Sequence, residues 1–166
     1  EKLVEASQAG VQIQLILRGI CCLRPGIAAR TENIHVTSIV GRYLEHGRIY
    51  CFGRGREARL WIASADLMTR NLNRRVEIAC PVYDPEVRTQ LLWILRTQLE
   101  DNVKASSLLP DGSYCRKVNT LAPCDSQEVF MDKSIHRSRR REPEGALQRL
   151  LGGLRGKRKG GGGGGI

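Results

Sequence analysis

A histidine and an arginine two positions apart, His46 and Arg48, are the residues of this sequence best suited to chemistry on a phosphate. If they stand at the start of a strand, the pleat turns both side chains to one face. An arginine donates a rigid fork of hydrogen bonds to phosphate oxygens, and a histidine can donate a proton, accept one or become phosphorylated. An isolated H-x-R pair, however, is more often two ordinary polar residues of a half-exposed strand.

Ser64 and Asp66 repeat the i, i+2 spacing near the end of the next expected strand, a short hairpin away from His46. A hydroxyl or carboxylate at that place can orient an imidazole through its second ring nitrogen. A polar, positively charged turn that contains Arg70 follows directly. These residues favour the interpretation of His46 and Arg48 as part of a site.

Arg18 begins a loop, residues 18–26, directly after the first expected strand. Ligands of α/β proteins collect at the carboxyl ends of strands, and Gly19 and Gly26 would let backbone N–H groups approach an anion there. Three loops at one edge therefore predict a single phosphoryl-transfer site. Its candidate residues are Arg18, His46, Arg48, Ser64 and Asp66, with Arg70 beside them.

The hydropathy pattern around these residues is that of an α/β fold. Apolar and polar residues alternate in five segments, which predict strands at 11–17, 34–40, 48–52, 59–65 and 76–82. Helices are expected at 2–9, after Asp84 and from Asp125, where Glu128 completes a capping box. The helix after Asp84 carries an apolar stripe that should face a sheet, formed by Val87, Leu91, Leu95 and Leu99.

Composition limits the classes of function. The chain has 166 residues, 41% of them hydrophobic, which suffices for one core. Lys and Arg number 27 against 17 Asp and Glu, giving a net charge of +10 and favouring an anionic partner. Because only 5% of the residues are aromatic, the stacking platforms that single-stranded nucleic acid prefers are scarce, and no specific nucleic-acid partner is expected.

The sequence also indicates where the protein resides. It contains no apolar run long enough to span a membrane and no signal-peptide pattern, so a cytoplasmic location is expected, with a peripheral position at the inner face of the membrane as the alternative. The six cysteines include no C-x-x-C pair and predict reduced, mostly packed thiols. The histidines share no metal-like spacing with them, so no metal site is expected in this chain.

The two ends of the chain differ from the segments between them. An amphipathic pattern is already under way at residue 1, which is Glu, and indicates a piece of a longer protein. Residues 132–166 are basic and glycine-rich and predict a disordered tail, with a short helix around 146–151. Such a tail can bind polyanions, but a solvated extension is the simpler interpretation.

Residues 1–131 resemble the carboxy-terminal catalytic domain of the first family of polyphosphate kinases, in which two phospholipase-D-like domains share one active site. The resemblance is carried, in the right order, by residues 6–11, 17–26, 37–46, 64–68, 70–72 and 74–77. It implies an α/β fold of the phospholipase-D type, a mixed sheet flanked by helices. The pairs His46-x-Arg48 and Ser64-x-Asp66 are similar to degenerate forms of the phospholipase D signature.

The resemblance also implies an activity. The family transfers the terminal phosphate of ATP reversibly to inorganic polyphosphate, through a phosphohistidine and with Mg²⁺. The phosphorylated histidine and the magnesium-contacting residues belong to the preceding domain, so this piece alone should be inactive. Arg18 matches the arginine that holds nucleotide phosphates, and His46 matches a second active-site histidine. The partners implied are ATP, ADP, polyphosphate, the preceding domain and further copies of the complete enzyme.

Some positions depart from the family pattern, and two other functions stay open. Ala63, Thr69, Asn73 and Cys51 stand where the family usually has Gly, Pro, Asp and an aromatic residue. The first alternative is a polyanion-binding module without catalysis, driven by charge and the tail. The second, a phospholipase-D-type phosphodiesterase, is disfavoured because Arg48 replaces the lysine and Asp66 the asparagine of that signature.

Overall fold

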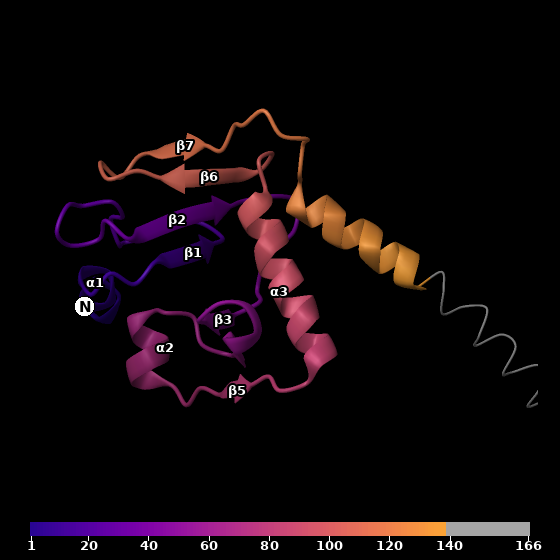
Figure 1. Ribbon diagram of the computed structural model, residues 1–166, viewed down its shortest axis with the longest axis horizontal. Coiled ribbons are helices and arrows are strands. Elements are labelled where there is room, and N and C mark those ends of the chain that lie inside the picture. Colours follow the sequence, from indigo (N-terminus) through magenta and orange to yellow (C-terminus); the bar gives the residue numbers. More distant parts are fainter. Residues whose placement is uncertain (139–166) are drawn as a thin grey trace, which may run out of the picture. The chain divides into compact units, whose positions relative to one another are not determined.

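The computed structural model describes residues 1–138 (Figure 1). Residues Glu1–Gln127 form one compact unit, and the described residues from Glu128 to 138 lie outside it. The expected tail from 139 onward and the expected helix at 146–151 lie outside the described residues.

The larger sheet has four strands in the order β1-β2-β6-β7. Its strands are β1 (Ile13–Leu17), β2 (Ile34–Ile39), β6 (Ala105–Leu108) and β7 (Tyr114–Arg116). β1 runs parallel to β2, whereas β6 and β7 pair antiparallel, so the sheet is mixed as the resemblance implied. The two short strands β6 and β7 were not predicted, because each has too few residues to show an alternating pattern.

The smaller sheet is an antiparallel meander of β3 (Ile49–Phe52), β4 (Arg59–Ala63) and β5 (Ala79–Pro81). Gly53 and Gly55 have positive φ in the turn between β3 and β4, a conformation that favours glycine. The expected strand at 76–82 is shorter than predicted. A second sheet was not predicted either, because sequence periodicity marks strands but not which strands pair.

Three α-helices belong to this unit: α1 (Lys2–Gln8), α2 (Thr69–Arg74) and α3 (Pro85–Glu100). The Asp84 carboxylate accepts hydrogen bonds at 2.9 Å from the N–H groups of Glu86 and Val87, so it caps α3 as predicted. α3 follows the smaller sheet in the chain and leads into β6 of the larger one (Figure 1). α2 replaces the polar turn expected around Arg70.

The apolar stripe of α3 is less buried than predicted. Val87 is exposed, and Leu91, Leu95 and Leu99 are only half-buried. The one fully buried residue of α3 is Thr97, whose hydroxyl donates to the Trp93 carbonyl at 2.9 Å.

A further helix begins at Ser126, where the Asp125 carboxylate accepts from the Gln127 N–H at 3.1 Å. The predicted start at Asp125 is thereby confirmed. The helix continues through residue 138, so residues 132–138 are helical and not disordered as expected.

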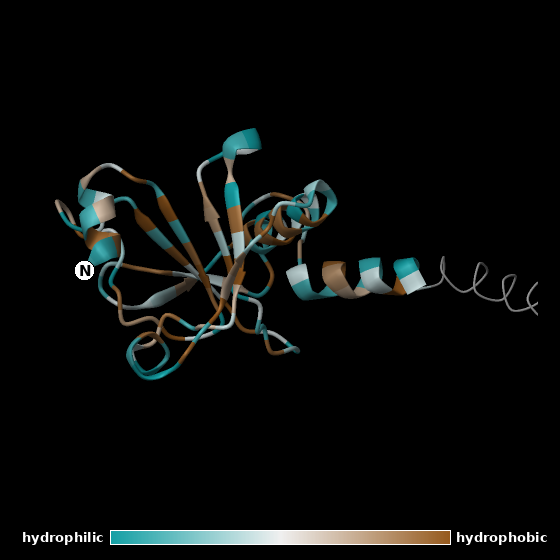
Figure 2. Cartoon of the chain, turned by 90° about the horizontal axis from the view of Figure 1, so that it is seen from below, coloured by the Kyte–Doolittle hydropathy of each residue, from teal (hydrophilic) through white to brown (hydrophobic). Residues whose placement is uncertain are grey.

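The core lies on β2, the central strand of the larger sheet. Ile34 and Val36 are buried with Leu108 of β6, and residues of β1 pack against them. Leu60 is buried in the smaller sheet. Figure 2 shows apolar residues alternating with polar ones along the strands, the pattern of strands with one buried face.

The cysteines are more exposed than predicted. Cys22, Cys51, Cys80 and Cys115 are exposed, and Cys21 and Cys124 are half-buried. Cys51, Cys80 and Cys115 lie on β3, β5 and β7, at positions that face solvent. Apolar neighbours such as Phe52 and Tyr114 are exposed as well, so an apolar sequence context did not predict burial on these strands.

Candidate functional site

The carboxylate of Asp66 is the centre of the candidate site. Its Oδ1 accepts from Arg48 Nε at 3.0 Å, and its Oδ2 accepts from Arg48 Nη2 at 3.1 Å. Arg18 Nη2 donates to the same Oδ2 at 3.3 Å. A forked pair of this kind fixes the plane of the guanidinium as well as its position. Asp66 therefore joins two arginines that are far apart in the sequence.

His46 lies against the Arg48 guanidinium. Arg48 Nη2 is 2.9 Å from His46 Nε2, and Arg48 Nη1 is 3.3 Å from Nδ1. Because arginine only donates, the 2.9 Å contact is a hydrogen bond in the neutral tautomer whose Nε2 carries no proton. The imidazole itself is exposed, so an incoming phosphate can reach it.

Hydrogen bonds and charges favour the ionised form of this cluster. The hydrogen bond from Arg48 holds the pKa of the Asp66 carboxyl below its usual value. Burial opposes this effect, and the charges of Arg48 and Arg18 lower the pKa further. The same hydrogen bond raises the pKa of Arg48. Nearby, burial raises the pKa of the Tyr50 hydroxyl, which donates to the Ala65 carbonyl at 3.3 Å.

The elements of both sheets position these side chains. Arg18 follows the last residue of β1, and Asp66 comes shortly after β4. Arg48 directly precedes β3, where its carbonyl accepts from the Ala63 N–H at 3.0 Å and extends the ladder. His46 lies in the loop before β3 and not on a strand, so the pleat does not pair it with Arg48 as predicted. The two side chains are nevertheless in contact, because the Arg48 guanidinium lies beside the His46 imidazole.

The two other candidates, Ser64 and Arg70, lie apart from this cluster. The Ser64 hydroxyl donates to Glu77 and accepts from the Ile78 N–H at 3.0 Å, so it does not orient His46 as predicted. Asn71 Nδ2 also donates to Glu77, at 2.8 Å. The hydrogen bonds from Ser64 and Asn71 lower the pKa of Glu77. Arg70 is exposed on α2.

Comparison with known proteins assigns the chain to a family. Residues 1–127 match the family described as "Polyphosphate kinase C-terminal domain 2". The chain belongs to this polyphosphate kinase domain family. It is 52% identical over 135 residues to the polyphosphate kinase of Staphylococcus haemolyticus, a match covering 81% of this chain and 19% of the relative. It is 46% identical over 150 residues to polyphosphate kinase 1 of Chlorobaculum tepidum, covering 90% and 21%.

A solved structure agrees with the sequence relatives. The crystal structure of polyphosphate kinase from Porphyromonas gingivalis matches with a TM-score of 0.76 and 43% identity. The match covers 82% of this chain and 21% of that one. The predicted α/β fold and family are thus confirmed, and the chain spans about a fifth of the length of its polyphosphate kinase relatives.

Gly26, at the end of the 18–26 loop, acts differently from the prediction, whereas the role of the Gly19 N–H stays a prediction. The Gly26 N–H donates to the Thr31 carbonyl at 2.8 Å, and the Gly19 carbonyl accepts from the Ser38 hydroxyl at 2.8 Å. Gly26 has a positive φ of 69°, and a Cβ there would lie 3.0 Å from Pro110. In this polyphosphate kinase domain Gly26 shapes the turn, and its N–H is not available to an anion.

Three residues near the site were missed by sequence reasoning. The Glu45 carbonyl accepts from Arg18 Nη1 at 2.8 Å, and the Glu45 carboxylate accepts from Gln127 Nε2 at 3.1 Å and Gln98 Nε2 at 3.5 Å. The position of Glu45 beside His46 was the available signal. Gln98 and Gln127 gave none, because only folding brings them close.

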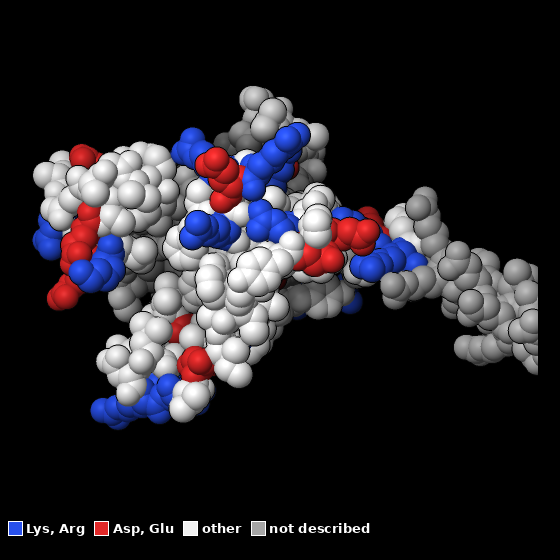
Figure 3. Space-filling model, turned by 60° about the horizontal axis from the view of Figure 1, so that its bottom comes forward, with Lys and Arg blue, Asp and Glu red and all other residues white. Residues whose placement is uncertain are grey.

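The charges of the domain are mixed. On the face drawn in Figure 3, Lys and Arg side chains are interspersed with Asp and Glu and form no continuous basic strip. Arg18, Arg48 and Asp66 together carry a net charge of +1 by formal count. At the site itself, the pair of arginines can attract phosphate.

A resident Mg²⁺, which the family resemblance implies, does not fit the described residues. Within residues 1–138, no group of three or more His, Cys, Asp or Glu side chains is placed to hold a metal ion. Both oxygens of Asp66 accept from arginine. Asp66 therefore has no oxygen free for a metal ion.

Among the helices of residues 1–138, none has the length and apolar character needed to cross a membrane.

Proposed function

We propose that this chain is the nucleotide-binding part of an ATP:polyphosphate phosphotransferase, a kinase that moves the terminal phosphate of ATP reversibly onto inorganic polyphosphate. The phosphate is carried by a histidine of a preceding domain, so the chain acts together with that domain and, in the complete enzyme, with further copies. The convergence of Arg18, Arg48 and His46 on Asp66 carries the proposal. Two arginines beside an exposed imidazole suit the binding and transfer of a phosphoryl group.

The arginines supply binding and alignment. Asp66 fixes Arg48 in the fork geometry and holds the end of the Arg18 side chain, so little rotamer freedom remains to be lost when phosphate binds. Arg18 uses two of its nitrogens in these contacts, and its half-buried side chain keeps further N–H groups for ATP phosphate oxygens. Positive charge at that place stabilises the charge on the transferring group.

His46 supplies proton transfer. In the neutral imidazole, Nε2 can release its hydrogen bond from Arg48 and accept a proton from the incoming group, or the N–H at Nδ1 can donate a proton to the leaving phosphate. Arg48 keeps the ring oriented toward the same place as the Arg18 guanidinium. Mg²⁺, where needed, would be held by ATP and by groups outside the described residues.

Two measurements test this function. The purified chain should make no polyphosphate from ATP, because the phosphorylated histidine lies elsewhere. A chimaera in which residues 1–127 replace the matching segment of the Staphylococcus haemolyticus enzyme should make it, and His46→Ala should lower its kcat about a hundredfold or more. His35→Ala, at the one exposed position of β2, is the matched control and should leave kcat near its starting value.

Two outcomes would contradict the proposal. Polyphosphate synthesis by the purified chain alone would show that the preceding domain is not required. Equal kcat values for the chimaera and its His46→Ala variant would remove His46 from the reaction. If the chain binds tripolyphosphate only while residues 132–166 are present, a polyanion-binding module is the better description.

A further inference from the structure

We propose that Gln127 is a positioning residue that holds the His46 loop, defined as residues 40–48 between β2 and β3, in its active arrangement. The inference rests on the proposed function, because it assigns a role to a residue that touches neither His46 nor phosphate. Gln127 is buried, with 5% of its surface exposed. It lies 81 positions after His46 in the sequence, at the end of the first compact unit.

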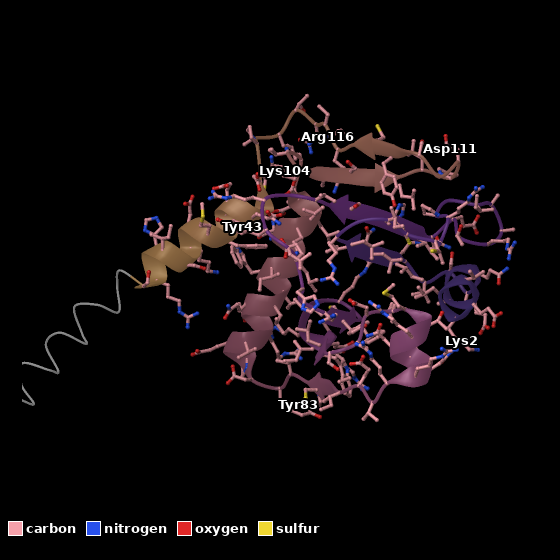
Figure 4. All side chains as sticks on the ribbon, turned by 180° about the vertical axis from the view of Figure 1, so that it is seen from behind. Lys2, Tyr43, Tyr83, Lys104, Asp111 and Arg116 are labelled. Atoms are coloured by element: carbon pink, nitrogen blue, oxygen red, sulfur yellow. The ribbon has the colours of Figure 1, made fainter. Side chains whose placement is uncertain are left out.

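Each polar atom of the Gln127 amide has a partner in the His46 loop. Oε1 accepts from the Tyr43 N–H at 2.9 Å, and Nε2 donates to the Tyr43 carbonyl at 2.7 Å. Nε2 also donates to Glu45 Oε1 at 3.1 Å. Turning the amide over would bring its oxygen against a carbonyl and a carboxylate, so only one orientation fits. Tyr43, labelled in Figure 4, is thus held on both sides of its backbone.

Glu45 connects this clamp to the candidate site. Its carboxylate accepts from Gln127, and its own carbonyl accepts from Arg18 Nη1 at 2.8 Å. The next residue in the chain is His46. The position of Glu45 is therefore fixed from one side by Gln127 and from the other by Arg18, which leaves the His46 backbone little freedom to move.

The loop is also shaped to receive the Gln127 side chain. A Cβ on Gly41 would lie 2.5 Å from Gln127 Oε1, closer than any side chain can approach. The backbone next to Gln127 is held in place as well. The buried Asp101 carboxylate accepts a hydrogen bond at 2.8 Å from the N–H of the preceding residue, Ser126. A glutamine locked in this way can position a loop, whereas an exposed one could not.

The first test uses the complete 166-residue chain and the side-chain NMR signals of its histidines. Gln127→Met keeps the size of the side chain but removes both amide partners, and Gln127→Glu places a carboxylate against Glu45. Both should shift or broaden the imidazole signals of His46 while those of His35 stay in place. Gln90→Met, at an exposed position of α3, is the matched control and should move neither.

The second test measures catalysis in the chimaera described above. Gln127→Met should lower kcat about ten- to a hundredfold, the effect of a small misplacement of a catalytic group. KM for ATP should change less than about threefold, because Asp66 still holds Arg18 and Arg48. A general loss of structure would instead reduce the amount of folded enzyme and leave kcat per folded molecule unchanged.

The outcomes separate this inference from the proposed function. If the unsubstituted chimaera makes no polyphosphate, the proposed function fails, while the NMR comparison still decides whether Gln127 positions His46. Unchanged His46 signals in a folded Gln127 variant overturn the positioning role. Circular dichroism reports folding, and if Gln127→Met and Gln127→Glu both unfold the chain, Gln127 serves folding as a whole and the inference is likewise overturned.

Discussion

Removal of the Asp101 carboxylate should destabilise the domain strongly. The Asp101 side chain is fully buried, and its Oδ1 accepts from the N–H groups of Val103, Lys104 and Ala105 at 2.8 to 3.1 Å. Its Oδ2 accepts from the N–H of Ser126 at 2.8 Å and from its hydroxyl at 2.7 Å. One carboxylate therefore satisfies five donors and ties the start of β6 to the start of the last described helix.

The size of the effect follows from those five hydrogen bonds. A hydrogen bond to a charged group contributes about 1.5–3 kcal/mol, and the contributions are not additive when one group serves several donors. Asp101→Ala should lower the free energy of unfolding by about 3–5 kcal/mol, the range for breaking a buried charged network. Asp101→Asn keeps one acceptor but turns its amide N–H toward donors, so it should cost about 2–4 kcal/mol.

Urea unfolding of the chain at pH 7 measures these values. Asp111→Asn is the matched control, because Asp111 also accepts from a backbone N–H and a hydroxyl, those of Ser113, but at an exposed turn. It should change the urea midpoint little, because hydrogen bonds to an exposed carboxylate compete with water. A loss below about 1 kcal/mol for Asp101→Ala, or equal losses at both positions, would refute the reasoning.

The pH dependence gives an independent check. Burial raises the pKa of the Asp101 carboxyl, but the hydrogen bonds from Ser126, Lys104 and Ala105 outweigh it and leave the pKa below the ordinary value of 3.8. A lowered pKa in the folded state means that the stabilisation is present above pH 3.8 and is lost as the pH falls through the folded value. The difference in stability between the unsubstituted chain and Asp101→Asn should therefore be constant near neutrality and shrink below about pH 4.

Three further predictions concern the site. Arg18→Ala should weaken the affinity of the chain for tripolyphosphate about tenfold, measured by calorimetry. Deletion of residues 132–166 should change the same affinity less than about threefold. Equal losses of affinity would place the site in the tail. Asp66→Asn should lower the free energy of unfolding, measured with urea at pH 7, by at most about 1 kcal/mol, because its ion pairs are partly exposed. This loss should vanish in acid, because the unsubstituted Asp66 becomes protonated as the pH falls below its lowered pKa. Gly41→Ala should lower the free energy of unfolding by about 1–3 kcal/mol, because the added Cβ would meet Gln127. Gly47→Ala should leave it nearly unchanged, because no atom lies within 4 Å of the added Cβ. Similar Tm values for the two variants would contradict the close fit of Gln127 against Gly41.

The sequence by itself determined five of the strands, the capped start of α3 and the loops that carry Arg18, His46 and Asp66. The Asp84 cap predicted the start of α3, and alternating apolar residues predicted β1 to β5. Capping and periodicity depend on neighbours within one turn or a few residues, so a sequence shows them directly. The loops that carry Arg18, His46 and Asp66 were expected to meet, and they do.

Only the tertiary structure decided which groups become partners. Asp66 binds Arg18 and Arg48 instead of orienting His46, and Ser64 turns to Glu77, because each polar side chain takes the partner that its rotamer can reach. Strands β6 and β7 are too short to show a period and exist through pairing with β2 and with each other. The hydrogen bonds between Gln127 and the His46 loop join segments more than 80 positions apart in the sequence. A contact over such a sequence separation leaves no local pattern from which it could be predicted.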